Sequence, residues 1–534
     1  MAGEPFEIDA EPSSSPVSPL TAAAVRLLGE RRLILAANRG PVSFSAGADG
    51  TLRTRRGSGG VVTALSQVGE HVPVTWVAAT MNDADRRAAR DPEALARALP
   101  TDRVRLRLAP VGRTVFEAAH NVIANPLLWF FQHEMWNLPE RPMIDAATMR
   151  AWHSGYVPLN EAFAEAVVRE VPRGDREPRI LLHDYHLYLA AAAIRRARPD
   201  AILSHFTHIP WPSSSLWLVL PPVIREGIVR GLLANDVVGF QTARYAHNFL
   251  RSVETFVPAA HVDFLSRTVV HDGRLTRIRV YPISIDVVAT RRVAASAAAR
   301  RRRVELQATS AERMLVRVDR LEPSKNILRG FRAFEALLER HSELRGSLSF
   351  LAFLVPSRTS IREYRDYGRK VRDEAERINA RFGRAGRVPV QIFFKHDYAQ
   401  ALAGLSIANV ILVNPLIDGM NLVAKEAAVV NERDGVLVLS ETAGAYDQMA
   451  DGALPVAAAD IVGTANALAA ALAMPVAERH ARLERLRAGV EREDISWWLQ
   501  RQLEDLAGIV ESRESAEERS EIRRRARPRR SAGG

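Results

Sequence analysis

The sequence predicts an α/β protein with two doubly wound domains. Short apolar runs, typical of strands buried on both faces, alternate with amphipathic helical stretches along the chain. This alternation predicts parallel sheets covered by helices on both sides. The 534 residues are too many for one hydrophobic core, and an Arg- and Ala-rich stretch at 291–313 divides the runs into two series.

The predicted strands are similar in number in the two series. Those of the first series are 33–37, 180–183, 202–208, 236–240 and 277–283, and those of the second are 314–318, 348–354, 390–394, 410–413 and 436–439. Between them, apolar residues recur at helical spacing, as at Ile327, Phe331, Phe334 and Leu338. Doubly wound sheets bind ligands at the carboxyl ends of their strands. We therefore expect two Rossmann-like domains that face a substrate cleft.

These patterns give the expected domain boundaries. We expect a disordered N-terminal tail at 1–28, an N-terminal domain at 29–285 and a C-terminal domain at 286–490. A helix at 491–511 is expected to cross back to the first domain, and an Arg-rich tail at 512–534 is expected to be disordered.

The composition excludes several classes of protein. The chain has no cysteine, which excludes disulfides and cysteine-held metals and fits a reducing compartment. No apolar run approaches the ~20 residues that span a bilayer, and the acidic, Ser- and Pro-rich start lacks a signal-peptide pattern. We therefore expect a cytoplasmic protein without a membrane partner, and a homo-oligomer is left open.

The net charge of +11 raises the alternative of nucleic-acid binding. Without the six arginines of the C-terminal tail the chain would carry +5; these are Arg523, Arg524, Arg525, Arg527, Arg529 and Arg530. The rest of the chain has no zinc-finger spacing or other nucleic-acid signature. Nucleic acid is therefore not expected as a partner, although polyanion binding by the tail is left open. Small phosphorylated molecules account for a mild basic excess equally well.

One candidate phosphate site follows the predicted strand 410–413. Residues 418–426 read Asp-Gly-Met-Asn-Leu-Val-Ala-Lys-Glu, and a helix is predicted from Asn421. The glycine permits a tight turn before that helix, whose N-terminal amides and positive dipole end favour a diphosphate. Asp418 would accept hydrogen bonds from sugar hydroxyls, and Glu426, about two turns into the helix, would reach a ribose diol. The alternative is an acidic N-cap and an ordinary helix carboxylate.

Two cations follow the predicted strand 314–318. Arg320 and Lys325 lie in the segment Val-Asp-Arg-Leu-Glu-Pro-Ser-Lys-Asn, at the mouth of the same domain. Two cations directed at one point would stabilise the charge on a departing diphosphate. A single loop cation is usually only solvated, so the pair is the informative feature.

Polar residues also end two strands of the first domain. Residues 183–186 read His-Asp-Tyr-His, and His208 lies in Thr-His-Ile-Pro-Trp-Pro, whose prolines fix the loop. His208 is a candidate contact of a transferred sugar, and Asp184 is a candidate for acceptor hydroxyls. A serine-hydrolase triad is a poor alternative because no Gly-x-Ser-x-Gly elbow is present. His183 and His186 lack a third ligand at metal-site spacing, so no metal is expected.

Two further segments contain arginines or glycines. Arg39 leaves the first strand within Asn-Arg-Gly-Pro, and residues 57–60 read Gly-Ser-Gly-Gly before a predicted helix. This loop lacks the Gly-x-Gly-x-x-Gly spacing of a dinucleotide site, so a phosphate or a sugar is the expected ligand. Arg358 follows the strand 348–354 of the second domain and is expected to reach across the cleft.

Taken in order, these segments resemble the trehalose-6-phosphate synthase family (glycosyltransferase family 20) from about residue 33 to 506. The resemblance implies the GT-B architecture and a retaining hexosyltransferase. Such an enzyme moves glucose from UDP-glucose or GDP-glucose to glucose 6-phosphate and forms trehalose 6-phosphate. The resemblance also implies that no metal or other cofactor takes part, and that the leaving diphosphate accepts the acceptor's proton on the same face of the sugar.

The resemblance also assigns roles by position. The catalytic residues would be His208, Asp418, Arg320 and Lys325. The donor would be bound by Gly59, Gly60, Arg320, Lys325, Gly419, Met420, Asn421, Leu422, Val423 and Glu426. The acceptor would be bound by Arg39, His120, Trp129, Asp184 and Arg358.

Some residues depart from the family pattern. His120 stands where the family usually has a tyrosine against the acceptor phosphate, and residues 322–326 read Glu-Pro-Ser-Lys-Asn instead of Asp-Tyr-x-Lys-Gly. These features resemble validamycin-type pseudo-glycosyltransferases, which join a nucleotide-linked cyclitol to an aminocyclitol phosphate. Another acceptor, such as glycerol phosphate or a cyclitol phosphate, is therefore an alternative. So is a non-catalytic regulatory relative, although the charged residues of the donor site are all retained.

Overall fold

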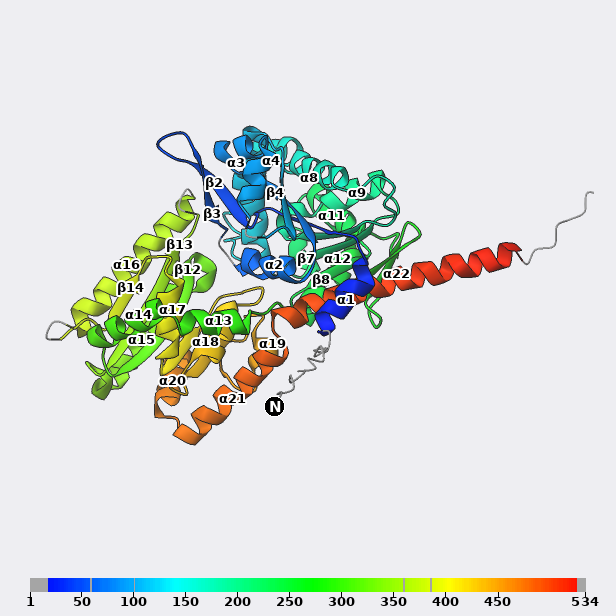
Figure 1. The fold of residues 1–534 in the computed structure, drawn as a ribbon. Helices are drawn as coiled ribbons and strands as arrows, with labels where there is room; N and C mark the ends of the chain where they lie inside the picture. The colour runs from blue at the N-terminus through cyan, green and yellow to red at the C-terminus, as the bar shows by residue number, and fades with distance from the viewer. Residues whose placement is uncertain (1–17, 58–59, 100, 359–360, 385–386, 526–534) are drawn as a thin grey trace, which may run out of the picture.

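The computed structural model describes residues 18–57, 60–99, 101–358, 361–384 and 387–525 (Figure 1). It contains two α/β domains, each organised around its own sheet. Both sheets are mainly parallel and are covered by helices. The predicted α/β class with two domains is confirmed.

The N-terminal sheet has nine strands in the order β5-β4-β1-β6-β7-β8-β11-β10-β9. Neighbouring strands are parallel from β5 to β11, and β10 and β9 add an antiparallel edge. The strands from β5 to β8 follow the doubly wound Rossmann order, which reverses between β1 and β6. Their bounds are β1 (Leu33–Ala37), β4 (Val74–Ala79), β5 (Val104–Ala109), β6 (Arg179–His183), β7 (Ile202–Thr207), β8 (Val237–Phe240), β9 (His261–Asp263), β10 (Thr268–His271) and β11 (Arg274–Val280).

Several strands are absent from the prediction. β5 alternates apolar residues with arginines, and the separate hairpin of β2 (Val42–Ala46) and β3 (Leu52–Arg56) is mainly polar. None of these gives the continuous apolar run on which the prediction relied. β4 is buried along its whole length, so a polar composition does not explain why the prediction lacks this strand.

Helices surround the N-terminal sheet. They are α2 (Gly60–His71), α3 (Asp83–Ala88), α4 (Pro92–Arg97), α5 (Arg113–Ala118), α6 (Phe130–Gln132), α7 (Ala146–Ala151), α8 (Val157–Arg169), α9 (Ala190–Ala197), α10 (Ser214–Trp217), α11 (Pro222–Leu232) and α12 (Ala243–Phe256). Two segments, η1 (Ala119–Trp129) and η2 (Trp152–Tyr156), are π-helical, and η3 (Tyr185–Leu187) is a 3₁₀ turn. π-Helical backbone is rare and frequently occurs at functional sites. η1 carries both His120 and Trp129.

The C-terminal sheet has six parallel strands in the order β14-β13-β12-β15-β16-β17, again doubly wound and reversing between β12 and β15. The strands are β12 (Arg313–Leu321), β13 (Leu348–Pro356), β14 (Val390–Phe393), β15 (Val410–Val413), β16 (Val436–Ser440) and β17 (Leu454–Val456). The helices are α13 (Val287–Ala294), α14 (Ala297–Thr309), η4 (Pro323–Lys325), α15 (Ile327–Arg340), η5 (Ser342–Leu344), α16 (Arg362–Phe382), α17 (Tyr398–Ser406), α18 (Leu422–Val430), α19 (Tyr446–Met449), α20 (Ile461–Ala473) and α21 (Val476–Arg492).

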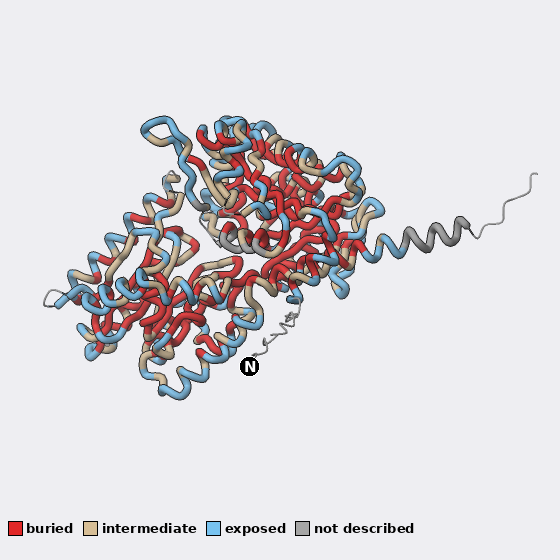
Figure 2. The backbone as a smooth tube through the Cα atoms, viewed as in Figure 1, coloured by how far each residue is buried: buried red, intermediate tan, exposed pale blue. Residues whose placement is uncertain are grey.

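Side chains of β12 alternate between two cores. Met314 and Val316 pack with residues of α17 and α18 on one face, whereas Leu315 packs with residues of α15, α16 and α20 on the other. Figure 2 shows the buried backbone that runs through both domains. Because both faces are filled, the register of β12 is fixed, and so is the position at which its polar continuation enters the cleft.

The last helix, α22 (Ile495–Arg525), returns to the N-terminal domain. The Tyr281 hydroxyl donates to Asp505 at 2.6 Å, and Arg513 pairs with Asp236 at 2.7 Å. The apolar face of α22 joins one core with α1 (Pro19–Leu28); its buried members include Trp498, Leu499, Leu503, Leu506 and Ala507. Farther along, the helix emerges from the body of the protein (Figure 2), and Glu511, Ser512, Glu514 and Ser515 are exposed.

Both expected tails are partly helical. Ser18 caps α1, Pro19 occupies its first turn and Gly29 ends it, so the expectation of disorder up to residue 28 is wrong for Pro19–Leu28. α22 continues to Arg525 because residues 511–525 contain good helix formers with charges of both signs and no proline or glycine. The expectation of disorder from 512 is therefore wrong as far as 525. Residues 1–17 and 526–534 lie outside the described residues.

The helices are short or amphipathic. Across the described ranges, no single helix is both long and apolar enough to cross a membrane, and α20 and α21 pass that test only as a pair bent by 110°. Leu468 and Ala471 of α20 pack in the core of the C-terminal domain, which accounts for the apolar composition of that helix.

Candidate functional site

The candidate site lies where the carboxyl ends of the two sheets meet. The polar loops after β6 and β7 contact those after β13 and β15, near the reversal points of both sheets. The domains touch at Gly419, where a Cβ would lie 2.1 Å from the carbonyl oxygen of His208. The Tyr245 hydroxyl donates to the Asp418 carbonyl at 3.0 Å. Only glycine fits at position 419, so this glycine permits close contact between the two walls.

Lys325 and Asp418 form a nearly buried ion pair at one end of the site. The turn η4 after β12 brings the Lys325 ammonium to 2.5 Å from the Asp418 carboxylate, with side chains 11% and 13% exposed. The Asn421 amide donates to the same carboxylate oxygen at 3.1 Å. Burial alone would raise the pKa of Asp418, but Lys325 holds it below its usual value. The carboxylate is therefore ionised at neutral pH.

The N-terminus of α18 lies beside this pair. Asn421 caps the helix by accepting from the Ala424 N–H at 3.3 Å. Met420 is buried, and Leu422 and Val423 begin the helix, whose first amides have no partner within it. One turn on, Glu426 accepts from the Tyr398 hydroxyl at 3.0 Å, and burial raises its pKa to about 7. The predicted helix start is therefore placed next to the predicted cations.

A buried carboxylate links an arginine near the end of β12 to an arginine in the loop after β13. Glu322 is fully buried and pairs with Arg320 at 2.8 Å and with Arg358 at 2.7 Å. Its burial would raise its pKa, but the two guanidiniums hold the pKa below its usual value. Arg320 stays half exposed while its partner is buried. Glu322 thus fixes both guanidiniums relative to each other.

Arg358 crosses the cleft to the N-terminal domain. Its Nε donates to the Asn125 side-chain oxygen at 3.0 Å, and its guanidinium lies 4.6 Å from the ring centroid of Trp129. A second nitrogen donates to the Tyr364 hydroxyl at 2.9 Å. The predicted reach of Arg358 across the cleft is thus present in the structure, and the buried Trp129 lies beside it.

His120 lies on η1 within this group. Its ring stacks on Phe116 with centroids 5.0 Å apart, and Asn125 donates to its Nε2 at 2.9 Å. Burial, together with the nearby cations Arg39 and Arg358, lowers the pKa of His120 to about 4, so the ring is neutral at pH 7. Arg39, after β1, is thereby placed at the same end of the site as Arg358.

Asp184 and His208 lie together between the two ends. Asp184 has a left-handed backbone with φ of 73°, and its carboxylate accepts from the His208 N–H at 3.3 Å. Burial raises the pKa of Asp184 to about 7 and lowers the pKa of His208 to about 3. Arg358 and Asn421 also have positive φ, so strained backbone concentrates in these loops.

The sequence missed three members of this site. Asn125, Tyr185 and Glu322 connect the predicted residues through hydrogen bonds and ion pairs across long sequence separations. Only Glu322 is marked by a local sequence feature, because it stands where the family pattern has aspartate. Gly60 begins α2, and Gly59 lies outside the described residues. No group of three or more His, Asp or Glu side chains in the described part of the chain is placed to hold a metal ion.

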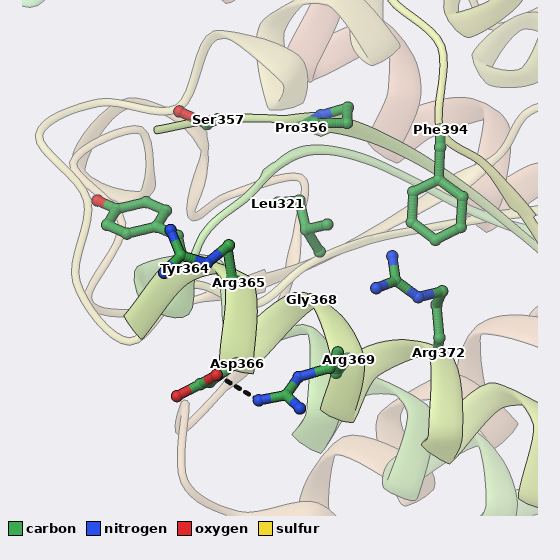
Figure 3. Close-up of a pocket in the computed structure, with 10 residues that line it drawn as sticks. All are labelled: Leu321, Pro356, Ser357, Tyr364, Arg365, Asp366, Gly368, Arg369, Arg372 and Phe394. Atoms are coloured by element: carbon green, nitrogen blue, oxygen red, sulfur yellow. Dashed lines mark hydrogen bonds and ion pairs between the residues drawn. The ribbon is translucent and has the colours of Figure 1, made fainter. Parts of the chain in front are cut away.

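A cavity of about 570 Å³ opens beside Tyr364, the partner of Arg358 (Figure 3). Its lining comes from the ends of β12 and β13, from α16 and from the segment after β14, and includes Arg365, Arg369, Arg372 and Phe394. Figure 3 shows Arg369 paired with Asp366, and the Arg372 guanidinium lies 5.5 Å from the Phe394 ring centroid. The cavity thus places basic side chains around the tyrosine that contacts Arg358.

The sequence model of glycosyltransferase family 20 matches residues 31–508. The chain belongs to glycosyltransferase family 20. It is accordingly a hexosyltransferase enzyme, and the resemblance of its motifs to that family is confirmed. The match spans both sheets and the first part of α22.

Known relatives agree with this assignment. A bifunctional trehalose-6-phosphate synthase/phosphatase from Thermoproteus tenax is 33% identical over 88% of this chain, which spans 62% of that relative. A validamine 7-phosphate valienyltransferase from Streptomyces hygroscopicus subsp. jinggangensis is 30% identical over 91% of this chain and 96% of its own. A crystal structure of an alpha,alpha-trehalose-phosphate synthase (UDP-forming) from Burkholderia xenovorans, in complex with glucose-6-phosphate, is 28% identical, with a TM-score of 0.75 over 89% of this chain and 99% of that chain. The GT-B fold is confirmed.

Proposed function

We propose that this family 20 enzyme transfers glucose from a nucleotide-diphosphate glucose to glucose 6-phosphate and so forms trehalose 6-phosphate. The observation that carries the proposal is the buried Glu322, which holds Arg320 and Arg358 in one cluster. Two cations held next to each other by one carboxylate suit two phosphorylated substrates that meet in one cleft, a diphosphate donor and a phosphate acceptor. A similar structure described as UDP-forming contains glucose-6-phosphate, which supports the same pair of substrates.

At the donor end, Arg320, Lys325 and the first amides of α18 would neutralise the leaving diphosphate. These groups are fixed before the reaction by the Asp418 and Glu322 carboxylates. Preorganised donors directed at developing charge lower the barrier because little reorganisation is needed. Asp418 and His208 would hold the glucosyl unit, and Glu426 the ribose. Gly59 and Gly60 would close on the donor.

At the acceptor end, Arg39, His120 and Arg358 would bind the 6-phosphate, with Trp129 beside it. Asp184 would accept a hydrogen bond from the acceptor sugar. Transfer with retention would follow if the acceptor hydroxyl attacks from the side on which the diphosphate departs, with a diphosphate oxygen taking the hydroxyl proton. The proposal includes no metal or other cofactor, places the reaction in the cytoplasm and leaves the oligomeric state open.

A cyclitol phosphate acceptor is the second candidate, because a valienyltransferase is among the relatives and His120 replaces the usual tyrosine. Asp418, Asn421 and Arg39 follow the pattern of the sugar-transferring members, which favours glucose 6-phosphate. A silent regulatory relative is not favoured, because the chain is a family 20 hexosyltransferase in which the ion pair between Lys325 and Asp418 is intact.

The test is diphosphate release from UDP-glucose and GDP-glucose with a panel of acceptors. The panel contains glucose 6-phosphate, glycerol 3-phosphate, a cyclitol phosphate and no acceptor. We expect release that depends on glucose 6-phosphate with at least one donor. Release that depends on another acceptor would replace glucose 6-phosphate in the proposed reaction. No release with any acceptor would contradict the proposed reaction.

A further inference from the structure

Asn125 has a position in the acceptor end that no comparison assigns. It lies on the π-helical segment η1, five residues after His120, and its side chain is buried. Both atoms of its amide group are engaged, with partners from three different elements. A buried amide with so many partners has one orientation, and that orientation has a chemical consequence.

The orientation of the Asn125 amide follows from Arg358. The Nε of an arginine can only donate, so the atom 3.0 Å from it must be the Asn125 oxygen. The Tyr185 hydroxyl donates to the same oxygen, also at 3.0 Å. The Asn125 nitrogen therefore faces His120, where its two hydrogens reach the ring Nε2 at 2.9 Å and the backbone carbonyl at 3.0 Å.

This orientation fixes the tautomer of His120. Because the Asn125 nitrogen donates to Nε2, Nε2 must be the unprotonated nitrogen, and the hydrogen of the neutral ring lies on Nδ1. Nδ1 is buried and has no hydrogen-bond partner among the described residues. The ring cannot easily turn away, since it is stacked between Phe116 and His186, with centroids 5.0 Å and 5.8 Å away.

We propose that Asn125 is a positioning residue that holds His120 as a neutral Nδ1–H donor for the phosphate of the acceptor. The phosphate as ligand rests on the proposed function. Phosphate oxygens accept hydrogen bonds, so they match a ring that can only donate at this atom, next to the cations Arg39 and Arg358. A buried N–H without a partner destabilises the folded protein, and a bound phosphate oxygen would supply the missing acceptor.

The first test is direct and needs no activity. We would record ¹⁵N NMR spectra of the histidine rings in the full chain and assign His120 by its loss in His120→Tyr. We expect Nδ1 to be the protonated nitrogen of His120 and its signal to shift on addition of glucose 6-phosphate. A neutral His120 with its hydrogen on Nε2 would overturn the proposal.

Inorganic phosphate separates this inference from the proposed reaction. If inorganic phosphate shifts the Nδ1 signal but glucose 6-phosphate does not, the positioning role stands and glucose 6-phosphate is the wrong acceptor. If neither shifts it, the proposed role of His120 is overturned whatever the enzyme transfers.

The second test is Asn125→Asp, measured at a pH where the ring is neutral. A carboxylate can still accept from Arg358 and Tyr185, but it can no longer donate to His120, so the ring hydrogen should move to Nε2. We expect the KM for the acceptor to rise about tenfold or more while the donor KM and kcat change by less than about threefold. The matched control is Asn121→Asp, at an exposed asparagine on the same segment. This substitution should leave both KM values and kcat unchanged.

The added charge of Asn125→Asp could by itself repel a phosphate. The same substitution is therefore also made in a His120→Tyr background, where no tautomer exists. We expect a smaller rise in the acceptor KM there than in the wild-type background. Equal rises in the two backgrounds would show that charge repulsion, not the tautomer, causes the effect, and would overturn the proposal.

Discussion

The donor end and the acceptor end of the site are built in different ways. Lys325, Asp418 and Asn421 come from one domain and contact one another directly. At the acceptor end, Arg358 comes from the C-terminal domain, whereas Asn125 and its neighbours come from the N-terminal domain. The diphosphate contacts of the donor end are therefore organised within one domain, although the predicted glucosyl contact His208 comes from the other. The acceptor end exists only where the two domains meet.

This difference matters for specificity. Lys325 is retained at the donor end, although residues 322–326 around it depart from the family pattern. The departure at a predicted ligand-binding residue, His120, falls in the acceptor end. An end assembled from two domains tolerates change in one wall while the other wall still supplies a cation. The acceptor is consequently the substrate on which relatives of similar fold would differ most.

The largest effect is expected at the donor end. Lys325→Ala removes a cation from the leaving diphosphate and leaves the buried Asp418 without its ion pair. We expect kcat to fall by about 10²- to 10³-fold, the usual loss for a donor that stabilises transition-state charge. Single-turnover diphosphate release measures this, with the exposed Lys370→Ala as control. A rate near that of the wild type would contradict the proposed diphosphate site.

A smaller and selective effect is expected at the acceptor end. Arg358→Ala removes the guanidinium that spans the cleft to Asn125. We expect the acceptor KM to rise by about 10- to 100-fold, the cost of losing hydrogen bonds to a charged group, with a much smaller change in the donor KM. Initial rates with either substrate varied measure this, and the exposed Arg362→Ala is the control. Equal changes in both KM values would remove the distinction between the ends.

Between the two ends, Asp184 gives a pH-dependent prediction. Burial raises its pKa from 3.8 to about 7, so the folded chain holds a proton that the unfolded chain has released. This contribution lowers stability as the pH rises from about 4 to about 7, and the loss persists above that range. Asp184→Asn has no ionisable carboxyl at this position, so it should not lose this stability as the pH rises. We expect it to raise the thermal midpoint more at about pH 8 than at about pH 5, while it weakens acceptor binding.

The control for this prediction is the exposed Asp272→Asn, which should give the same thermal midpoint as the wild type at both pH values. If Asp184→Asn lowered the midpoint at the higher pH, the carboxylate would be stabilising in the folded state. Burial would then not destabilise the charged carboxylate, and the proposed loss of folding stability at Asp184 would be wrong.

The smallest effect is expected far from both ends. Deleting Arg523–Arg530 should leave kcat and both KM values unchanged within about twofold, because α22 contacts the N-terminal domain through residues before 514. Steady-state kinetics at two salt concentrations measure this. A loss of turnover, or a steep salt dependence that the deletion abolishes, would give the tail a role in binding.

The sequence was sufficient for the ten strands that it predicts and for the loops that follow them. Buried parallel strands are continuous apolar runs, and substrate loops follow their carboxyl ends, so Lys325 and Asp418 could be placed near each other. β5 was missed because its outward residues are arginines, and α1 was missed because its apolar face is short and is completed only by α22. For α1, the missing information lay in a partner segment.

The connections within the site could not be predicted for the same reason. Asn125 and Arg358 are 233 residues apart, and their hydrogen bond exists only because two domains meet. Glu322 was visible as a change of residue, but its pairing with Arg358 depends on the register between β12 and β13. Local patterns identify residue types and element ends, whereas these pairings depend on tertiary contacts.

The most direct test of one site with two phosphorylated substrates is the product itself. The enzyme would be incubated with UDP-glucose and glucose 6-phosphate, and the product analysed by mass and by NMR. We expect an α,α-1,1-linked disaccharide phosphate, formed only when glucose 6-phosphate is present. A β-linked product, or UDP release that does not depend on the acceptor, would contradict a retaining transfer between the two ends of this site.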